Sequence, residues 1–115
     1  MLAVVGAGHW GRNHVRNFAA LGALSAICDA DAQTLEHTAR CYPGAKAYAD
    51  LADLLADASI KAVVLATPAQ LHFPQAKAAL AAGRHVLVEK PMALSLAEAQ
   101  ELERMSRELG LVLMV

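Results

Sequence analysis

Short, mostly apolar runs recur along the chain, and each is followed by a longer segment with the periodicity of a helix. The runs, of which the third is the weakest, are Leu2–Val5, Leu24–Cys28, Ala45–Tyr48, Lys61–Ala66, His85–Val88 and Leu111–Val115. A strand that is apolar at nearly every position is buried on both faces, which is typical of a parallel sheet covered by helices. The alternation therefore predicts an α/β fold in which a helix joins each strand to the next.

Helix signals fill the gaps between these runs. Asp31 and Asp50 are typical N-caps, Ser95 and Glu98 form a capping box, and a glycine follows several of the expected helices. These helices cover residues 10–21, 32–40, 51–55, 70–82 and 96–109. Right-handed crossovers then predict a doubly wound, six-stranded parallel sheet with the strand order 3-2-1-4-5-6, a single dinucleotide-binding (Rossmann) domain over residues 1–115.

Composition and charge exclude several classes of protein. The chain is 57% hydrophobic and 18% charged, which excludes a disordered chain. A formal net charge of −1 with no basic stripe argues against nucleic-acid binding, and no apolar run approaches the roughly 18 residues of a membrane span. Cys28 and Cys41 lack the spacing of a metal site or a disulfide framework, and Met1 begins no visible signal peptide. We expect a cytoplasmic protein without a metal site, in which Cys28 is a small buried hydrophobic residue.

Three glycines follow the first strand in the pattern Gly-x-Gly-x-x-Gly. Gly6 allows a sharp turn, Gly8 lacks the Cβ that would keep a diphosphate from the backbone, and Gly11 lets the next helix pack close to the sheet. The backbone amides near His9, Trp10 and Gly11 would face the anion at the positive end of the helix dipole. The loop is therefore interpreted as a pyrophosphate-binding turn.

Asp29 ends the second strand, 18 residues after Gly11. A carboxylate at this position can accept hydrogen bonds from both ribose hydroxyls of an adenosine and would repel a 2′-phosphate. Residues 30–33 include no Arg or Lys that could bind such a phosphate, which favours NAD over NADP. Taken alone, Asp29 could also be a turn residue or a helix cap, but Asp31 is better placed to cap the helix.

The later segments KAVVLATPAQLH and AGRHVLVEKPMALS, together with the glycine motif and Asp29, closely resemble the glucose–fructose oxidoreductase/inositol dehydrogenase (Gfo/Idh/MocA) family. The resemblance covers essentially all 115 residues. The opening GHWGRNHVRNFAALGALSAICD is most similar to family members that oxidise C3 of UDP-N-acetylglucosaminuronic acid. The resemblance implies an oxidoreductase that moves a hydride from the CH–OH group of a sugar, a sugar nucleotide or a polyol to NAD.

The resemblance also assigns roles to residues at the carboxyl ends of the fourth and fifth strands. Thr67 and Pro68 would flank the cofactor, and His72 would lie near its nicotinamide half. Glu89 would hydrogen-bond the nicotinamide-side ribose or orient its neighbour. Lys90 would be the catalytic residue, because an ammonium beside the hydroxyl oxygen stabilises negative charge and can relay the proton. The peptide bond from Lys90 to Pro91 is often cis in this family.

Less specific interpretations stay open for several of these residues. Lys90 could be a solvated lysine at a strand end, His72 a surface residue at the start of a helix, and Trp10 a packing residue. The whole chain could also be a non-catalytic module that senses NAD, which would need neither Glu89 nor Lys90. An S-adenosylmethionine-dependent methyltransferase would share the glycine loop and Asp29 but gives no reason for Glu-Lys-Pro.

Members of the family carry a second, C-terminal α+β domain that these residues lack. In the family that domain forms the wall of the substrate site and most of the oligomer interface. We therefore expect the 115 residues to bind NAD but to turn over little substrate by themselves, and the full-length protein to be a homo-oligomer.

Overall fold

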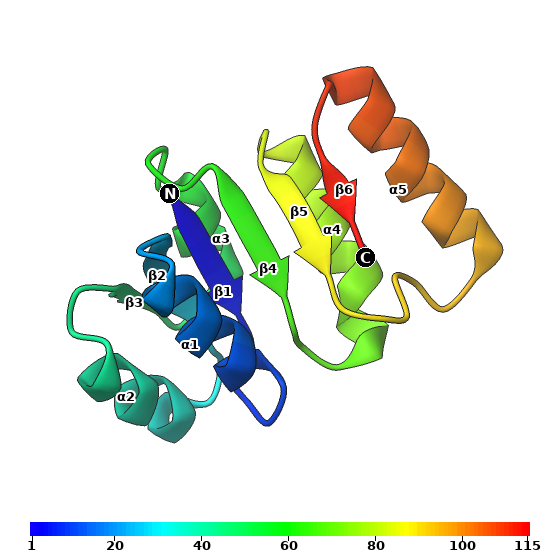
Figure 1. The fold of residues 1–115 in the computed structure, drawn as a ribbon. Coiled ribbons are helices and arrows are strands. Elements are labelled where there is room, and N and C mark those ends of the chain that lie inside the picture. The colour runs from blue at the N-terminus through cyan, green and yellow to red at the C-terminus, as the bar shows by residue number, and fades with distance from the viewer.

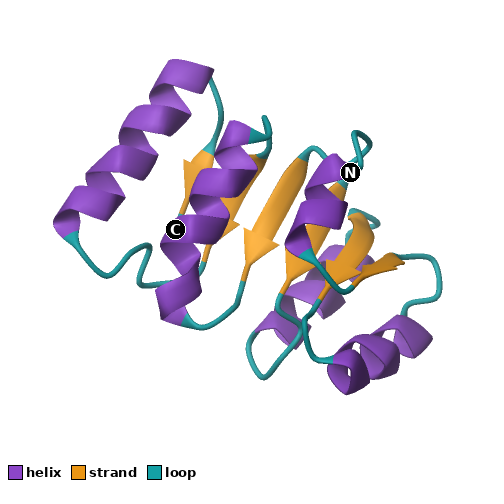
Figure 2. Ribbon diagram, turned by 180° about the vertical axis from the view of Figure 1, so that it is seen from behind, coloured by secondary structure: helices purple, strands orange, loops and turns teal.

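Six parallel strands form one sheet in the order β3-β2-β1-β4-β5-β6, with helices on both of its faces (Figures 1 and 2). The computed structural model describes residues 1–115. The strands are β1 (Leu2–Val5), β2 (Leu24–Cys28), β3 (Lys46–Tyr48), β4 (Ala62–Leu65), β5 (His85–Val88) and β6 (Leu113–Met114). The helices are α1 (Gly11–Ala20), α2 (Ala32–Cys41), α3 (Leu51–Ala56), α4 (Ala69–Ala81) and α5 (Leu96–Leu109). The predicted fold class and strand order are confirmed.

Several element boundaries agree with the sequence prediction, and the largest difference is at the last strand. The bounds of β1, β2, β5 and α5 are as predicted, and Asp31, Asp50 and Ser95 each cap a helix through the side chain. The prediction of a last strand over 111–115 is wrong at both ends. Leu111 donates its amide to Ser106 O at 2.9 Å, because the chain is still closing the end of α5 at that residue. The strand that pairs with β5 is confined to Leu113 and Met114, although Val112 O also accepts from Val86 N at 2.9 Å.

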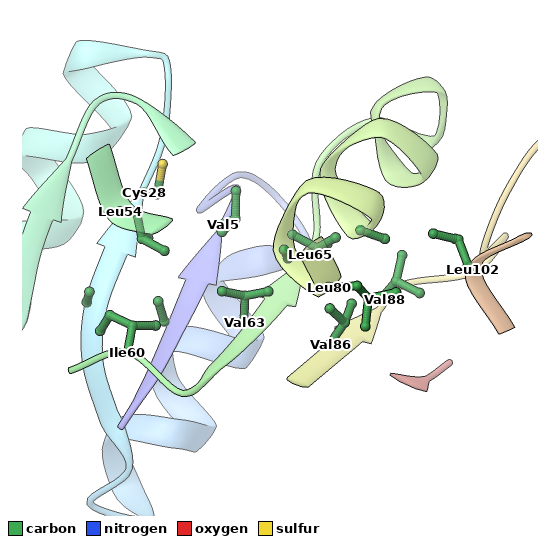
Figure 3. Packing of buried hydrophobic residues seen from close by; sticks show 14 residues of the cluster. Val5, Cys28, Leu54, Ile60, Val63, Leu65, Leu80, Val86, Val88 and Leu102 are labelled. Atoms are coloured by element: carbon green, nitrogen blue, oxygen red, sulfur yellow. The ribbon is translucent and has the colours of Figure 1, made fainter. Parts of the chain in front are cut away.

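Buried side chains fill both sides of the sheet. The larger cluster lies between the sheet and α3, α4 and α5, and contains Leu54, Leu80 and Leu102 from those three helices (Figure 3). The smaller cluster, which includes Val4, Val15 and Ile27, lies under α1 and α2. Cys28 belongs to the larger cluster, which confirms the prediction that it is buried. No helix has both the length and the apolar character needed to cross a bilayer.

The strand order places a topological switch point between β1 and β4. These neighbours pair in parallel, yet β1 leads into α1 on one face and β4 leads into α4 on the other. The two connections diverge at the carboxyl edge of the sheet, which is where doubly wound folds bind their ligands. This edge therefore carries the candidate site.

Candidate functional site

The glycine loop between β1 and α1 packs directly against the end of β4. Gly6 has φ +85°, and a Cβ at this position would lie 2.8 Å from Ala66 O. A Cβ on Gly11 would lie 1.7 Å from Gly6 O, so the helix can begin here only without a side chain. Both glycines are thus required by the fold itself, in agreement with the predicted sharp turn and close helix packing.

Gly8 differs from the other two glycines because nothing in the protein requires it. A Cβ built on Gly8 would have no atom within 4 Å, so the space in front of it is open. None of the backbone amides of Gly8, His9, Trp10 and Gly11 donates to another backbone group. The first turn of α1 contains no acidic residue that would compete for the positive end of the helix. An open backbone with free amides at a helix start fits a diphosphate.

Asp29 faces the glycine loop from the end of β2 and holds it in place. Its Oδ2 accepts a hydrogen bond from Ala7 N at 2.7 Å, and its Oδ1 accepts one from Asp31 N at 2.9 Å. Asp31 caps α2 by accepting from Thr34 N, as predicted. Asp29 therefore does not cap α2, in agreement with the sequence interpretation, but it has a structural role of its own in bracing the glycine loop. Each carboxylate oxygen has two lone pairs, so acceptor positions remain for a ribose.

A cavity of about 400 Å³ runs along the carboxyl edge between the glycine loop and the end of β4. Gly6, Gly8, Asp29, Thr67 and Pro68 are among its lining residues. The charged residues of its lining are aspartates, and it contains no Lys or Arg. Such a wall fits an adenosine with free ribose hydroxyls and would repel a 2′-phosphate.

A second cavity of about 340 Å³ adjoins the first, because both share Ala66 and Thr67 in their walls. Trp10, Glu89 and Lys90 line this second cavity. Lys90 follows β5 and lies at the same edge of the sheet as the glycine loop, and the Lys90–Pro91 peptide bond is cis. Apart from His9 and Gly11, the sequence-predicted site residues line these two neighbouring cavities.

Glu89 is held by two side chains of the glycine-motif helix. Trp10 Nε1 donates to Glu89 Oε1 at 2.7 Å, and His14 Nε2 lies 2.7 Å from the same oxygen. Burial raises the pKa of Glu89, but the hydrogen bonds from His14 and Trp10 outweigh it and bring this pKa below its ordinary value. Glu89 is therefore a carboxylate at neutral pH. Trp10 does more than pack the helix onto a neighbour, since its indole N–H is bound to Glu89.

His72 is buried in the wall of the second cavity, with only 2% of its surface exposed. The alternative that it is a surface residue is wrong. Its ring nitrogens lie 2.8 Å from Thr67 O and 2.7 Å from Pro91 O. The imidazole thus ties the end of β4 to the turn after Lys90, and backbone carbonyls rather than the open cavity face both nitrogens.

His9 and His14 lie near the start of α1 and make different contacts. The side chain of His9 lines a third cavity of about 610 Å³ between α1 and α2, which shares Gly8 with the first cavity, and it accepts from Arg12 at 3.2 Å. His14 is the functional candidate that motif reasoning missed. Its spacing could have indicated it, because Trp10, His14 and Phe18 recur every four residues and therefore share one face of α1.

Comparison with known proteins shows the family and the fold of this chain. The model of the oxidoreductase family with an NAD-binding Rossmann fold, Gfo/Idh/MocA, matches residues 1–115. The chain is 37% identical over 115 residues to a UDP-N-acetylglucosamine 3-dehydrogenase of Acidithiobacillus ferrooxidans. The alignment covers 97% of this chain and 35% of that protein. It is 38% identical over 117 residues to a 4-carboxy-2-hydroxymuconate-6-semialdehyde dehydrogenase of Sphingobium, in an alignment that covers 99% of this chain and 37% of that protein.

A solved structure shares the same fold. The WlbA dehydrogenase from Chromobacterium violaceum, in complex with NADH and UDP-GlcNAcA, superposes with a TM-score of 0.90 at 31% identity. That match covers 97% of this chain and 33% of the solved chain, so the chain spans about a third of the length of these similar proteins. With its glycine loop, switch-point cavity and Glu-Lys-Pro segment, the chain belongs to the Gfo/Idh/MocA family of NAD-binding oxidoreductases.

Proposed function

We propose that these residues form the cofactor domain of a dehydrogenase that oxidises the hydroxyl of a sugar, a sugar nucleotide or a polyol with NAD. One observation carries the proposal. The cavity lined by Lys90 adjoins the cavity lined by the glycine loop, and the two share Ala66 and Thr67. A dinucleotide bound along the edge would therefore have its diphosphate at Gly8 and its reactive ring beside Lys90. A module that only senses NAD has no use for an ammonium in this place.

Each residue has a defined task in this proposal. The amides from Gly8 to Gly11 bind the diphosphate, and Asp29 accepts from the adenosine ribose while it braces the loop. Bound NAD supplies the acceptor for a hydride. Lys90 as an ammonium stabilises the negative charge that develops on the substrate oxygen, and it takes up the hydroxyl proton once it has passed one of its own protons to solvent. Glu89 hydrogen-bonds the nicotinamide-side ribose or orients Lys90.

Cofactor binding is tested first. The 115-residue chain is titrated with NADH in an isothermal calorimeter, once alone and once in the presence of S-adenosylmethionine as a competitor. We expect NADH to bind, S-adenosylmethionine not to compete, and Gly8→Ala to abolish binding while the chain stays folded. NADPH should bind more weakly than NADH because Asp29 faces the ribose. Binding of S-adenosylmethionine in place of NADH would overturn the proposal.

Turnover is then measured with the full-length protein, NAD and a panel of UDP-sugars, free sugars and inositols. A semialdehyde belongs in the panel, because one relative is named for oxidising such a compound at the same level of identity. We expect oxidation of a hydroxylated substrate that Lys90→Met reduces by about 100-fold or more, with the NADH affinity unchanged. NADH binding without any turnover, or turnover of the semialdehyde alone, would contradict the proposed reaction.

A further inference from the structure

Two donors from one face of α1 converge on a single oxygen of Glu89. Trp10 already has helical backbone angles, φ −90° and ψ −40°, so His14 lies one turn further along the same face. Both side chains lie 2.7 Å from Oε1, although they are 79 and 75 residues from Glu89 in sequence. Both donors use Oε1, so Oε2 accepts from neither of them.

His14 is the better protected of the two donors. The side chains of His14 and Glu89 are each 20% exposed, whereas Trp10 is 56% exposed and its hydrogen bond is open to competition from water. The His14 ring also stacks on Phe18, with centroids 6.3 Å apart and planes inclined by 21°. Phe18 packs in turn on the buried cluster under α1. The contact between His14 and Glu89 is therefore anchored in the core.

We propose that His14 is a positioning residue that acts through Glu89. By holding the Glu89 carboxylate against the glycine-motif helix, it fixes the start of the Glu-Lys-Pro segment and keeps Lys90 at a constant place beside the nicotinamide position. The diphosphate-binding turn and the proton-handling lysine then move as one unit. The inference rests on the proposed function, because the role of Lys90 belongs to it.

Three variants of the full-length protein test the role of His14 in turnover. His14→Leu keeps the bulk of the ring without a donor, and His14→Gln keeps an N–H donor that can reach Glu89. The matched control is His37→Leu, since His37 is exposed on α2 and outside both site cavities. We expect His14→Leu to lower kcat at least about tenfold with KM for the hydroxylated substrate within about twofold, because a small displacement of a catalytic group is costly. His14→Gln should recover kcat to within about threefold of the original protein, and His37→Leu should leave it unchanged.

Trp10 is the single tryptophan of the chain and gives a second readout without any substrate. Its indole N–H is bound to Glu89, so its fluorescence reports on the placement of that carboxylate. In the 115-residue chain we expect His14→Leu to shift the Trp10 emission maximum, and His14→Gln and His37→Leu to leave it in place.

The outcomes separate the inference from the proposed function. Unchanged kcat and emission in His14→Leu, or a loss of kcat that His14→Gln does not recover, would overturn the positioning role while NAD-dependent turnover still stands. If the original protein neither binds NADH nor turns over substrate, the proposed function fails. The emission of His14→Leu then decides whether His14 holds Glu89.

Discussion

At the scale of single residues, three glycines of one motif meet three different physical requirements. Gly6 adopts a positive φ beside the Ala66 carbonyl, and Gly11 leaves room for the Gly6 carbonyl. A Cβ on Gly8 would meet no atom within 4 Å, so the packing of the protein does not require a glycine at this position. The motif thus combines two glycines that the packing requires with one whose proposed role is to let a diphosphate approach the backbone.

Alanine substitutions separate these requirements. We expect Gly11→Ala to unfold or strongly destabilise the chain, because its Cβ would lie 1.7 Å from a backbone oxygen. Gly8→Ala should keep the Tm within a few degrees and abolish NADH binding. Thermal melts and isothermal titration of both variants measure this. A folded Gly11→Ala that binds NADH normally would show that the loop is not packed as described.

The two cysteines should differ sharply in reactivity. Burial and the neighbouring Asp29 raise the pKa of Cys28 to about 11, whereas Cys41 is exposed. Because the thiolate is the reactive form, iodoacetamide at about pH 8 should modify Cys41 and spare Cys28. Mass spectrometry of the peptides reads the result, and both sites should react once the chain is unfolded in guanidinium. Fast modification of Cys28 in the folded chain would contradict its burial in the core.

At the scale of elements, a single carboxylate joins the end of α3 to β3. Asp57 follows α3 and accepts from Lys46 Nζ at 2.7 Å and from Tyr48 OH at 2.8 Å, both on β3. It also accepts from Ser59 N at 2.9 Å. These contacts fasten the outermost strand of the sheet, which is only three residues long, to the helix that follows it.

This junction makes stability depend on pH. The hydrogen bonds from Lys46, Ser59 and Tyr48 hold the pKa of Asp57 well below its ordinary value of 3.8. Because the pKa of Asp57 is lower in the folded chain than in the unfolded chain, its carboxylate stabilises the fold fully at pH values above the unfolded-state pKa. This stabilisation is lost as the pH falls toward and through the folded-state pKa. Asp57→Asn should therefore lower the Tm at about pH 7, and the difference should shrink progressively below pH 3.8.

The control for this experiment is Asp53→Asn, an exposed position in the first turn of the same helix. It should change the Tm much less than Asp57→Asn at neutral pH. A Tm difference for Asp57→Asn that stays constant from neutral to acid pH would show that the carboxylate contributes nothing as a charged group.

At the scale of the whole molecule, the buried core extends along the whole sheet, whereas the candidate site lies at its carboxyl edge. The buried side chains of α4 run from the carboxyl edge, where the helix begins beside the cavities, to Leu80 near its far end. Leu80 is fully buried against the sheet. A ligand that binds only the folded chain raises its stability by mass action, whatever the source of the intrinsic stability.

Leu80→Ala tests this separation. We expect the free energy of unfolding to fall by about 2–5 kcal/mol, as for other large-to-small changes in a core. The Kd for NADH should stay within about twofold, and NADH at 100 times its Kd should add about 2.7 kcal/mol to both proteins. Denaturant unfolding with and without NADH measures both the free energy of unfolding and its increase on NADH binding. A large change in Kd would mean that the far end of α4 is coupled to the site.

The sequence by itself determined the architecture of this protein and the edge at which its site lies. Apolar runs such as Leu2–Val5 are strands because only burial on both faces suits them, and parallel crossovers bring every strand end to one edge. The N-caps and the glycine motif are local signals, since their physics involves residues a few positions apart. Lys90 and Gly8 were brought to the same edge by topology alone.

Only the tertiary structure decided which distant groups the side chains at that edge contact. Asp29 braces the amide of Ala7, 22 residues away, and His72 reaches Pro91 across 19 residues. His14 meets Glu89 across 75 residues. Contacts of this kind depend on rotamers and on the packing of separate elements, which no local pattern specifies. The sequence therefore identified the chemistry available to the site, and only the packed fold showed which groups already hold one another.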